Sequence, residues 1–338
     1  MTPQALYRKF TPSWLKSTVW AFRQRADLIT EFARDWSRFG NFSGYMNANK
    51  FAESLLSEIM IDYHRLEKGL SLANTRPGFG KDVSLRLISN VSFYLDKMPC
   101  NFTITDALET IESYLEYQNS CNTSIPEVVE AYKILILSYN LQDKCREPFA
   151  TETTTRNQIH ASSKFDYKNF ITSRHSIRNF SDKPVTTEQL LDSIDLARYA
   201  PSVCNRQSWK VHIVTERKQI ARIIQIQKGA ITFAEKIPSL FIISSDLRRF
   251  VSAGERNQPW VDGGIFVMSQ LLALHAQGLG ACCLNWCGGR HADRALHKAL
   301  SLNPSEVVIA VIAVGHMEEE FSVAKASKIP VSEIAIFH

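Results

Sequence analysis

Three short segments in the second half of the chain carry side chains that could bind a phosphate and a heterocycle. In the first, residues 173–178 (SRHSIR), two arginines and two serines lie within six positions. Guanidinium groups bind phosphate oxygens in pairs, and hydroxyls and backbone amides add neutral donors. This pattern fits a site for a dianionic phosphate. A solvated turn with ordinary surface arginines is the alternative.

The second segment, residues 200–209 (APSVCNRQSW), combines two amide side chains with a proline and a tryptophan. Asn205 and Gln207 can each donate and accept hydrogen bonds. That capacity matches the edge of a heterocycle with alternating carbonyl and N–H groups. Taken alone, the segment is better explained as a polar loop in which Trp209 begins a core strand.

The third segment, residues 278–286 (GLGACCLNW), follows a long apolar stretch. Gly278 is placed to end a helix, and Gly280 permits a close approach of backbone to another group. Cys282, Cys283 and Cys287 raise the question of a metal or redox site. They form no Cys-x-x-Cys pair, so we expect no metal and interpret them as small residues that pack beside a ligand.

The elements that must position these segments form an α+β pattern. Residues 187–198, 217–227 and 261–277 have helical periodicity, and Thr186 followed by Gln189 predicts a capping box at the first helix. Residues 209–215, 238–244 and 307–314 are rich in β-branched residues and predict strands. The last two strands are wholly apolar, so we expect central strands covered on both faces.

The first 150 residues show helical periodicity and almost no strand alternation. The predicted helices are residues 18–39, 52–70, 83–95, 105–117 and 126–141, with an acidic first turn at Asp106 and Glu109. Residues 151–164 are polar and aperiodic. The sequence therefore predicts a helical domain over 1–150, a linker over 151–164 and a second domain over 165–338.

The composition and charge of the chain exclude some classes of protein. The chain has 338 residues, 45% of them hydrophobic and 22% charged, with a formal net charge of +5, which excludes a disordered chain and argues against a dedicated nucleic-acid binder. Seven cysteines without a disulfide spacing favour a reducing compartment. Residues 1–20 lack the apolar run of a signal peptide, and we expect a cytoplasmic protein. Residues 7–39 mix aromatic and basic side chains, and we expect them to pack on their own domain rather than on a membrane.

Together the three segments resemble the nitroreductase superfamily of FMN-dependent oxidoreductases. The family's Arg-x-Ser-x-Arg signature is matched by Arg174, Ser176 and Arg178. Its Ala-Pro-Ser-x-x-Asn-x-Gln-x-Trp loop is matched by residues 200–209, and its Gly-Leu-Gly by residues 278–280. The resemblance covers about residues 165–333, roughly half of the chain. It implies a central sheet flanked by helices, with FMN at the interface of a homodimer whose core includes residues 261–277.

The resemblance also implies roles for individual residues. The FMN phosphate and ribityl chain would be held by Arg174, His175, Ser176 and Arg178. The ribityl and pyrimidine portions would be lined by Pro201, Ser202, Asn205 and Gln207. The N5 edge of the flavin would adjoin Cys283, Leu284, Asn285 and Trp286. Lys325 and Lys328 match a basic pair that reaches back to the phosphate, although many members have arginine at the position of Lys328.

The implied activity is transfer of hydride or electrons between NAD(P)H or another donor and a small organic substrate. Because the flavin performs the redox chemistry, no catalytic acid or base need come from the protein. The alternative is a non-catalytic flavin-binding or helical interaction protein on a nitroreductase scaffold. The signatures do not name the substrate.

One local motif in the first half is compatible with a substrate site. His64, Glu67 and Lys68 share one helix face and precede a Gly-rich turn at residues 76–80. The alternatives are a salt-bridged helix end with a tight turn, and a set of polar groups that closes over the flavin. We expect the second, with these three residues facing the substrate. The extension resembles that of nitroreductase-like proteins associated with polysaccharide biosynthesis.

Overall fold

The first half of the chain is helical, as its periodicity predicts. The computed structural model describes residues 13–47, 50–144 and 149–338. The remaining residues, including the first twelve on which the signal-peptide expectation partly depends, lie outside this description. The N-terminal helices are α2 (Ser13–Phe42), α3 (Gly44–Asn47), α4 (Ala52–Leu70), α5 (Lys81–Leu95), α6 (Phe102–Ser120) and α7 (Pro126–Ser138). Among the described residues, no helix is both long enough and apolar enough to cross a bilayer.

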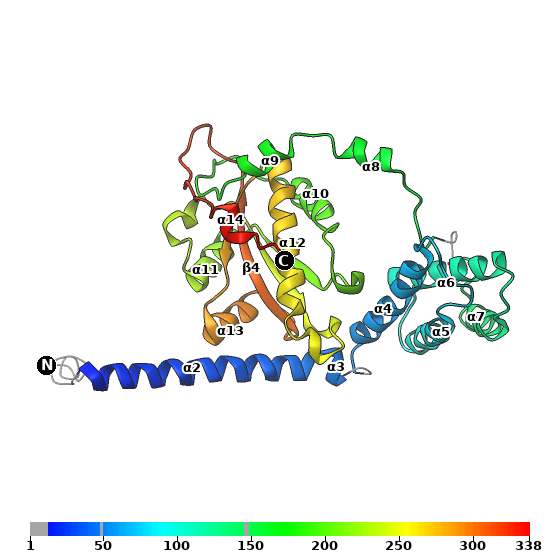
Figure 1. Cartoon of the computed structure of the whole chain (residues 1–338). Helices are drawn as coiled ribbons and strands as arrows, with labels where there is room; N and C mark the ends of the chain where they lie inside the picture. The colour runs from blue at the N-terminus through cyan, green and yellow to red at the C-terminus, as the bar shows by residue number, and fades with distance from the viewer. Residues whose placement is uncertain (1–12, 48–49, 145–148) are drawn as a thin grey trace.

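Helices α4 to α7 enclose a core of their own (Figure 1). Ile59 of α4, Leu87 of α5, and Leu108 and Ile111 of α6 have no exposed surface. Within each of these helices the buried apolar residues recur at three- and four-residue spacing, so each helix turns one apolar stripe inward. The periodicity alone therefore locates this core.

Several predicted helix boundaries differ from the structure, and two of them have a clear local cause. Helix α6 begins at Phe102, not at Thr105, because the side chain of Asn101 caps it by accepting a hydrogen bond from the Ile104 amide at 3.2 Å. Helix α7 ends at Ser138, three residues early, and Asn140 follows with a positive φ of 50°. Asparagine favours both positions because its short side chain bonds to nearby backbone.

An exposed segment connects the two halves. Residues 151–169 are all exposed, and they include α8 (Arg156–Ser162) and the start of α9 (Tyr167–Ser173). Thr155 and Gln158 form a capping box at α8. The domain boundaries given above stay a prediction.

The second half alternates helices and strands. Its helices are α10 (Thr187–Ala197), α11 (Arg217–Gln227), α12 (Gln258–Ala276), α13 (Gly289–Leu300) and α14 (Val331–Ile334), with short 3₁₀ turns that include η1 (Val203–Asn205), η3 (Leu247–Arg249) and η4 (Ala253–Glu255). Its strands are β1 (Trp209–Val214), β2 (Ser239–Asp246), β3 (Gly280–Asn285) and β4 (Glu306–Gly315). The capping box at Thr186 and the positive φ of Gly278 are confirmed. Helix α13 is a helix that the sequence analysis did not predict.

The four strands form one antiparallel sheet in the order β1-β2-β4-β3, covered on both faces. Along β2 the side chains alternate between the faces: Leu240 and Ile242 pack toward α11 and α13, and Phe241 and Ile243 pack toward α10 and α12. Every residue of β2 is buried. The expected fold, an α+β sheet flanked by helices and preceded by a helical region, is confirmed.

Helix α2 does not join the helical core but lies against the second half of the chain (Figure 1). Arg34 and Arg38 both bond to Asp293 of α13, and Arg38 also donates to the carbonyl of Glu306. Helix α4 makes a second connection, since Glu53 pairs with Arg248 and the Ser54 hydroxyl donates to the Arg248 carbonyl at 3.0 Å. The helical region is therefore bound to the sheet domain by charged and polar contacts.

Glu306, at the start of β4, is a buried carboxylate in a polar cluster. Its Oε2 lies 2.6 Å from His212 Nε2 and accepts a hydrogen bond from the Ser244 hydroxyl at 2.5 Å. Burial alone would raise the pKa of Glu306, but these hydrogen bonds and the charges of His212 and Lys210 outweigh it and lower the pKa from 4.5 to about 2. The folded state therefore keeps Glu306 ionised where the unfolded state takes up a proton.

This difference predicts an acid-sensitive contribution to stability. Glu306 stabilises the fold above pH 4.5, and the contribution is lost as the pH falls from about 4.5 to about 2. Urea unfolding of Glu306→Gln should show a shallower loss of unfolding free energy over this range than the unmodified protein. The exposed Glu130→Gln on α7 is the control and should leave the slope unchanged. Equal slopes for Glu306→Gln and the unmodified protein would contradict the assignment.

Candidate functional site

The fold brings the first and third segments together. Ser176 forms a β-bridge with Ala281 of β3, and the Ile177 amide donates to the Ala281 carbonyl at 2.9 Å. The expected close approach at Gly280 is confirmed, because a Cβ there would lie 2.8 Å from the Met317 side chain and 3.0 Å from that of Ile177. Glycine is required where two elements approach so closely.

A cavity of about 120 Å³ opens between these segments. It is lined by Ser173, Arg174, His175, Ile177, Leu271, His275, Leu279, Ala281, Met317 and Phe321. Arg174 and Arg178 form no ion pair with any carboxylate within the described ranges of the chain. A cavity beside an uncompensated guanidinium can accept an anion.

His275, at the end of α12, fixes one wall of the cavity. Its Nε2 lies 3.0 Å from the Ser173 hydroxyl and 3.1 Å from the Phe170 carbonyl. Burial lowers the pKa of His275, and the neighbouring charges of Arg174 and His175 lower it further. The ring is therefore neutral at pH 7, and it links α9 to the end of α12.

The second segment forms a strained loop at the other end of α12. Cys204, Asn205 and Gln207 have φ values of 48°, 52° and 47°. Residues other than glycine rarely adopt this left-handed backbone conformation, and each such residue destabilises the fold by about 1–2 kcal/mol. The Gln207 amide donates to the Ser202 hydroxyl at 3.0 Å, and the Gln207 side chain donates to the Asn205 carbonyl at 3.1 Å. Backbone strain of this kind concentrates at functional sites.

Two residues that the sequence analysis did not single out hold this loop. The Arg206 side chain is fully buried, pairs with Glu255 and donates to the Arg249 carbonyl at 2.7 Å. Asp262 of α12 accepts from the Val203 amide at 3.3 Å. Trp209 stacks on Phe266 with ring centroids 4.8 Å apart, so it does begin a core strand. The only sequence signal for Arg206 is its position inside the motif.

Within one chain the first and second segments lie far apart. The second contacts α12 at Asp262 and the first contacts it at His275, thirteen positions later. At 1.5 Å per residue these positions are about 20 Å apart along the helix axis. One chain therefore does not place both segments around one ligand of modest size.

The third segment continues along β3 into a loop. Leu284 is buried in the sheet core, while the Asn285 carbonyl accepts from Gln227 at 3.1 Å and the Trp286 indole donates to Asp293 at 3.2 Å. Burial raises the pKa of the Cys283 thiol, and the charge of Arg174 opposes this rise. The first and third segments thus also adjoin at Cys283. The structure forms no group of three metal-ligating side chains among the residues it describes.

Other predicted residues lie away from the cavity in the single chain. Lys325 and Lys328 are exposed, and Lys328 donates to the carbonyl of Ala326. His64 Nδ1 lies 2.8 Å from Glu67 Oε2, and Lys68 is exposed. The roles of these five residues stay predictions.

The Gly-rich turn beside His64 has a structural explanation. A Cβ on Gly69 would lie 2.1 Å from the Phe79 ring, and Gly78 and Gly80 have φ values of 74° and 68°. The Phe79 carbonyl accepts from the Tyr114 hydroxyl at 2.6 Å. The turn therefore packs against α4 and α6 inside the helical unit.

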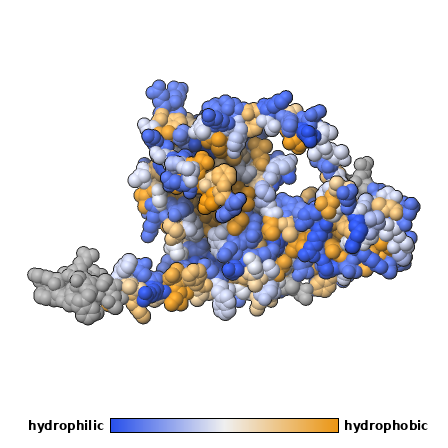
Figure 2. All heavy atoms as spheres, viewed as in Figure 1, coloured by the Kyte–Doolittle hydropathy of each residue, from blue (hydrophilic) through white to orange (hydrophobic). Residues whose placement is uncertain are grey.

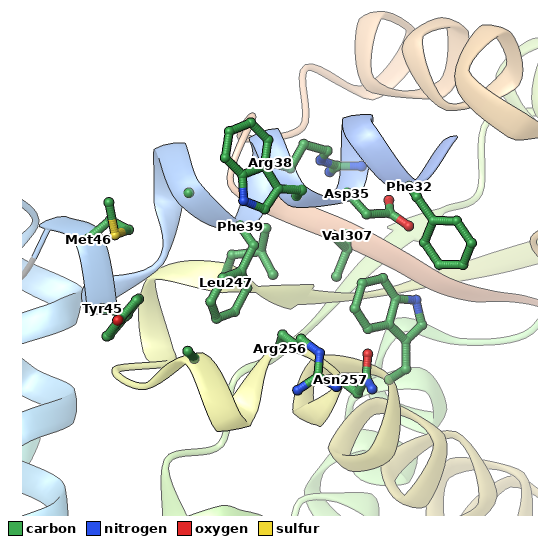
Figure 3. Close-up of a pocket in the computed structure, with 14 residues that line it drawn as sticks. Phe32, Asp35, Arg38, Phe39, Tyr45, Met46, Leu247, Arg256, Asn257 and Val307 are labelled. Carbon is green, nitrogen blue, oxygen red and sulfur yellow. The ribbon is translucent and has the colours of Figure 1, made fainter. Parts of the chain in front are cut away.

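An apolar pocket of about 370 Å³ lies between α2 and the start of α12 (Figure 3). Phe32 and Phe39 line it from α2, Tyr45 and Met46 from α3, and Trp260 from α12. Figure 3 shows Phe32, Asp35 and Arg38 on α2, with Arg256 and Asn257 on the opposite side. The pocket was not anticipated from the sequence, because its walls come from helices more than 200 residues apart.

All three segments lie in the part of the chain that matches a known protein family. Residues 171–240 and 225–316 match the model of the nitroreductase family. A protein of Archaeoglobus fulgidus, provisionally named NADH dehydrogenase/NAD(P)H nitroreductase, is 25% identical over 154 residues, 44% of this chain and 84% of the relative. The 4-nitrobenzoate reductase of Pseudomonas putida is 21% identical over 210 residues, 47% of this chain and 88% of the relative.

The solved structures to which this chain is similar include an FMN-dependent nitroreductase from Clostridium difficile. It is 24% identical, covers 51% of this chain and 99% of its own, and superimposes with a TM-score of 0.43. The family model spans all three segments and leaves α2 to α8 outside. Residues 171–316 therefore match the nitroreductase family model, and the N-terminal helices lie outside this match.

Proposed function

We propose that the chain is an FMN-dependent oxidoreductase that takes electrons from NAD(P)H or another donor and passes them to a small organic substrate. The cavity beside Arg174 is the observation that carries this proposal. Its guanidinium lacks a carboxylate partner among the described residues, and hydroxyl and imidazole groups surround it. This donor set fits a phosphate monoester. The family match and the named relatives support the oxidoreductase class.

The chain's own residues would bind and orient the cofactor. Arg174, His175, Ser176 and Arg178 would hold the phosphate and ribityl chain, with Lys325 and Lys328 as further cations. Pro201, Ser202, Asn205 and Gln207 would line the pyrimidine side, and residues 283–286 the N5 edge. When bound, FMN would supply the redox chemistry, accepting and releasing a hydride equivalent.

The separation of the segments along α12 supports a homodimer. The outer face of α12 exposes an apolar stripe, in which Trp260, Val261, Ile265 and Met268 are each 40–50% exposed. Figure 2 shows apolar side chains gathered on the face of the domain where α12 lies. Water-exposed stripes of this kind mark interaction sites.

A two-fold axis would pair this stripe with itself. Two α12 helices that pack antiparallel place the His275 end of one chain beside the Asp262 end of the other. The first segment of one chain would then face the second segment of its partner. The first and second segments of the same chain would stay about 20 Å apart along α12. We infer two composite FMN sites in each dimer, both built from the two chains.

The phosphate role of Arg174 can be tested by substitution. A charge-assisted hydrogen bond contributes about 1.5–3 kcal/mol, so Arg174→Ala should weaken FMN binding by about ten- to a hundredfold. Fluorescence titration of the apoprotein with FMN measures the change. Arg156→Ala, on the exposed helix α8, is the control and should bind FMN normally. An unaltered FMN dissociation constant for Arg174→Ala would remove the basis of the proposal.

The dimer can be tested on the α12 stripe. Ile265→Asp would bury a carboxylate in the proposed interface and should give a single-chain mass by light scattering, with FMN content greatly reduced because both sites are shared. Ile231→Asp, an equally exposed isoleucine of the same domain, is the control and should remain dimeric. A dimer of undiminished stability for Ile265→Asp would exclude α12 as the interface.

A further inference from the structure

A second hollow, rich in arginine, lies between α2 and the first turns of α13. It has a volume of about 660 Å³, within the range of small-molecule sites. Arg34 and Arg38 line it from α2, and Arg290 and Arg294 from α13. Thr30, Ser37 and His291 complete the wall, which contains no acidic residue.

The two arginines of α2 are held in place by one shared carboxylate. Both bond to Asp293, whose side chain is 9% exposed, and Arg38 also donates to the Glu306 carbonyl. Burial lowers the pKa of Arg38 and the charge of Asp293 opposes this effect. Fixed guanidiniums lose less conformational entropy on binding a ligand than mobile ones do.

The two arginines of α13 add charge that nearby groups do not balance. Neither Arg290 nor Arg294 is in an ion pair in the described part of the chain, and their side chains are half-buried and exposed, respectively. Glu31 and Asp35 are the other nearby carboxylates: Glu31 accepts from the backbone amide of Arg290 at 3.2 Å and lies 3.5 Å from Arg34, and Asp35 interacts with the charges of Arg34 and Arg38. Four guanidiniums thus lie near three carboxylates, none of which lines the hollow itself, and the hollow keeps an excess of positive charge.

We propose that this hollow binds the phosphate groups of a small-molecule reactant. Arginine recognises phosphate oxygens in a planar, bidentate arrangement, and the Thr30 and Ser37 hydroxyls offer neutral donors. The site is built only when the extension packs on the matched part of the chain, because α2 lies outside the residues that match the family model and α13 lies within them. An adjoining hollow shares Arg34 and Arg38 and is lined by Trp286 and Cys287, which connects the site to the third segment. This adjoining hollow also contains the carboxylates of Glu31, Asp35 and Asp293, so the phosphates themselves are assigned to the arginine-lined hollow.

This assignment rests on the proposed function only in naming the reactant. If residues 283–286 adjoin the flavin, a ligand held by its phosphates at α2 would have its reacting end near the flavin edge. The phosphates could then belong to the dinucleotide electron donor or to a phosphorylated acceptor. Both sources present the same chemistry to the four arginines.

The binding test uses inorganic pyrophosphate and the purified full-length protein. Isothermal titration calorimetry at low salt should show that the unmodified protein binds pyrophosphate. The affinity of an Arg290→Gln/Arg294→Gln double variant should be at least about tenfold lower. These two arginines are chosen because neither supports the buried Asp293 cluster. Arg222→Gln, an exposed arginine of α11 that lines none of these hollows, is the control and should bind as the unmodified protein does. Equal affinity in the double variant, or no binding by the unmodified protein, would overturn the proposal.

Flavin reduction then identifies the source of the phosphates. If they are the donor's, the double variant should need at least about tenfold more NADPH for half-maximal reduction, while reduction by dithionite stays unchanged. Loss of pyrophosphate binding with normal NADPH reduction would support the site and assign it to a phosphorylated acceptor. A protein that binds no FMN would refute the proposed function but would leave the pyrophosphate titration as an independent test of the arginine site.

Discussion

The packing of α12 on the sheet determines where the first and second segments lie. Gly263 allows this contact, because a Cβ there would lie 2.6 Å from the Ile309 side chain of β4. Phe266, Leu271 and Leu274 then fill the space over the sheet. Once α12 is fixed, its two ends hold the strained loop at Asp262 and the cavity at His275. The length of one helix thus sets the spacing between the first and second segments, and its outer face is the surface that we propose for a second chain.

The strained loop depends on interactions that no local pattern reveals. Three left-handed residues would together cost about 3–6 kcal/mol, and the loop keeps this conformation only because its surroundings enforce it. The fully buried Arg206 pairs with Glu255 and bonds to the carbonyls of Val203 and Arg249, which anchors the centre of the loop. A buried charge pair adds little net stability, but removing one partner is strongly destabilising. The pair therefore enforces one loop geometry, and the backbone at Asn205 and Gln207 is held in its left-handed conformation by the folded chain itself.

Much of the fold, and the identity of the segments, could be predicted from the sequence. Helix periodicity located α4 and α11 to the residue, and the Thr186–Gln189 box is a purely local signal. Helix α13 was missed because it begins at a glycine pair without a side-chain cap and because few of its positions are buried. The arginine hollow could not be predicted, since Arg34 and Asp293 are 259 positions apart and no periodicity reports such a pairing. Local patterns fix elements, whereas sites between elements depend on tertiary packing.

Helix α2 shows most clearly how the extension differs from ordinary surface helices. Its charged side chains Arg34 and Arg38 contact the sheet domain and are 20% and 15% exposed, whereas its apolar side chains Ile29, Phe32 and Trp36 are 65–81% exposed, although Phe32 and Trp36 line the pocket beside α12. A helix that only covered a core would bury the apolar side. Removing two guanidiniums from water is costly, and Asp293 offsets only part of that cost. The arrangement is therefore better explained by what α2 presents, a row of fixed cations beside the third segment, than by the stability it adds.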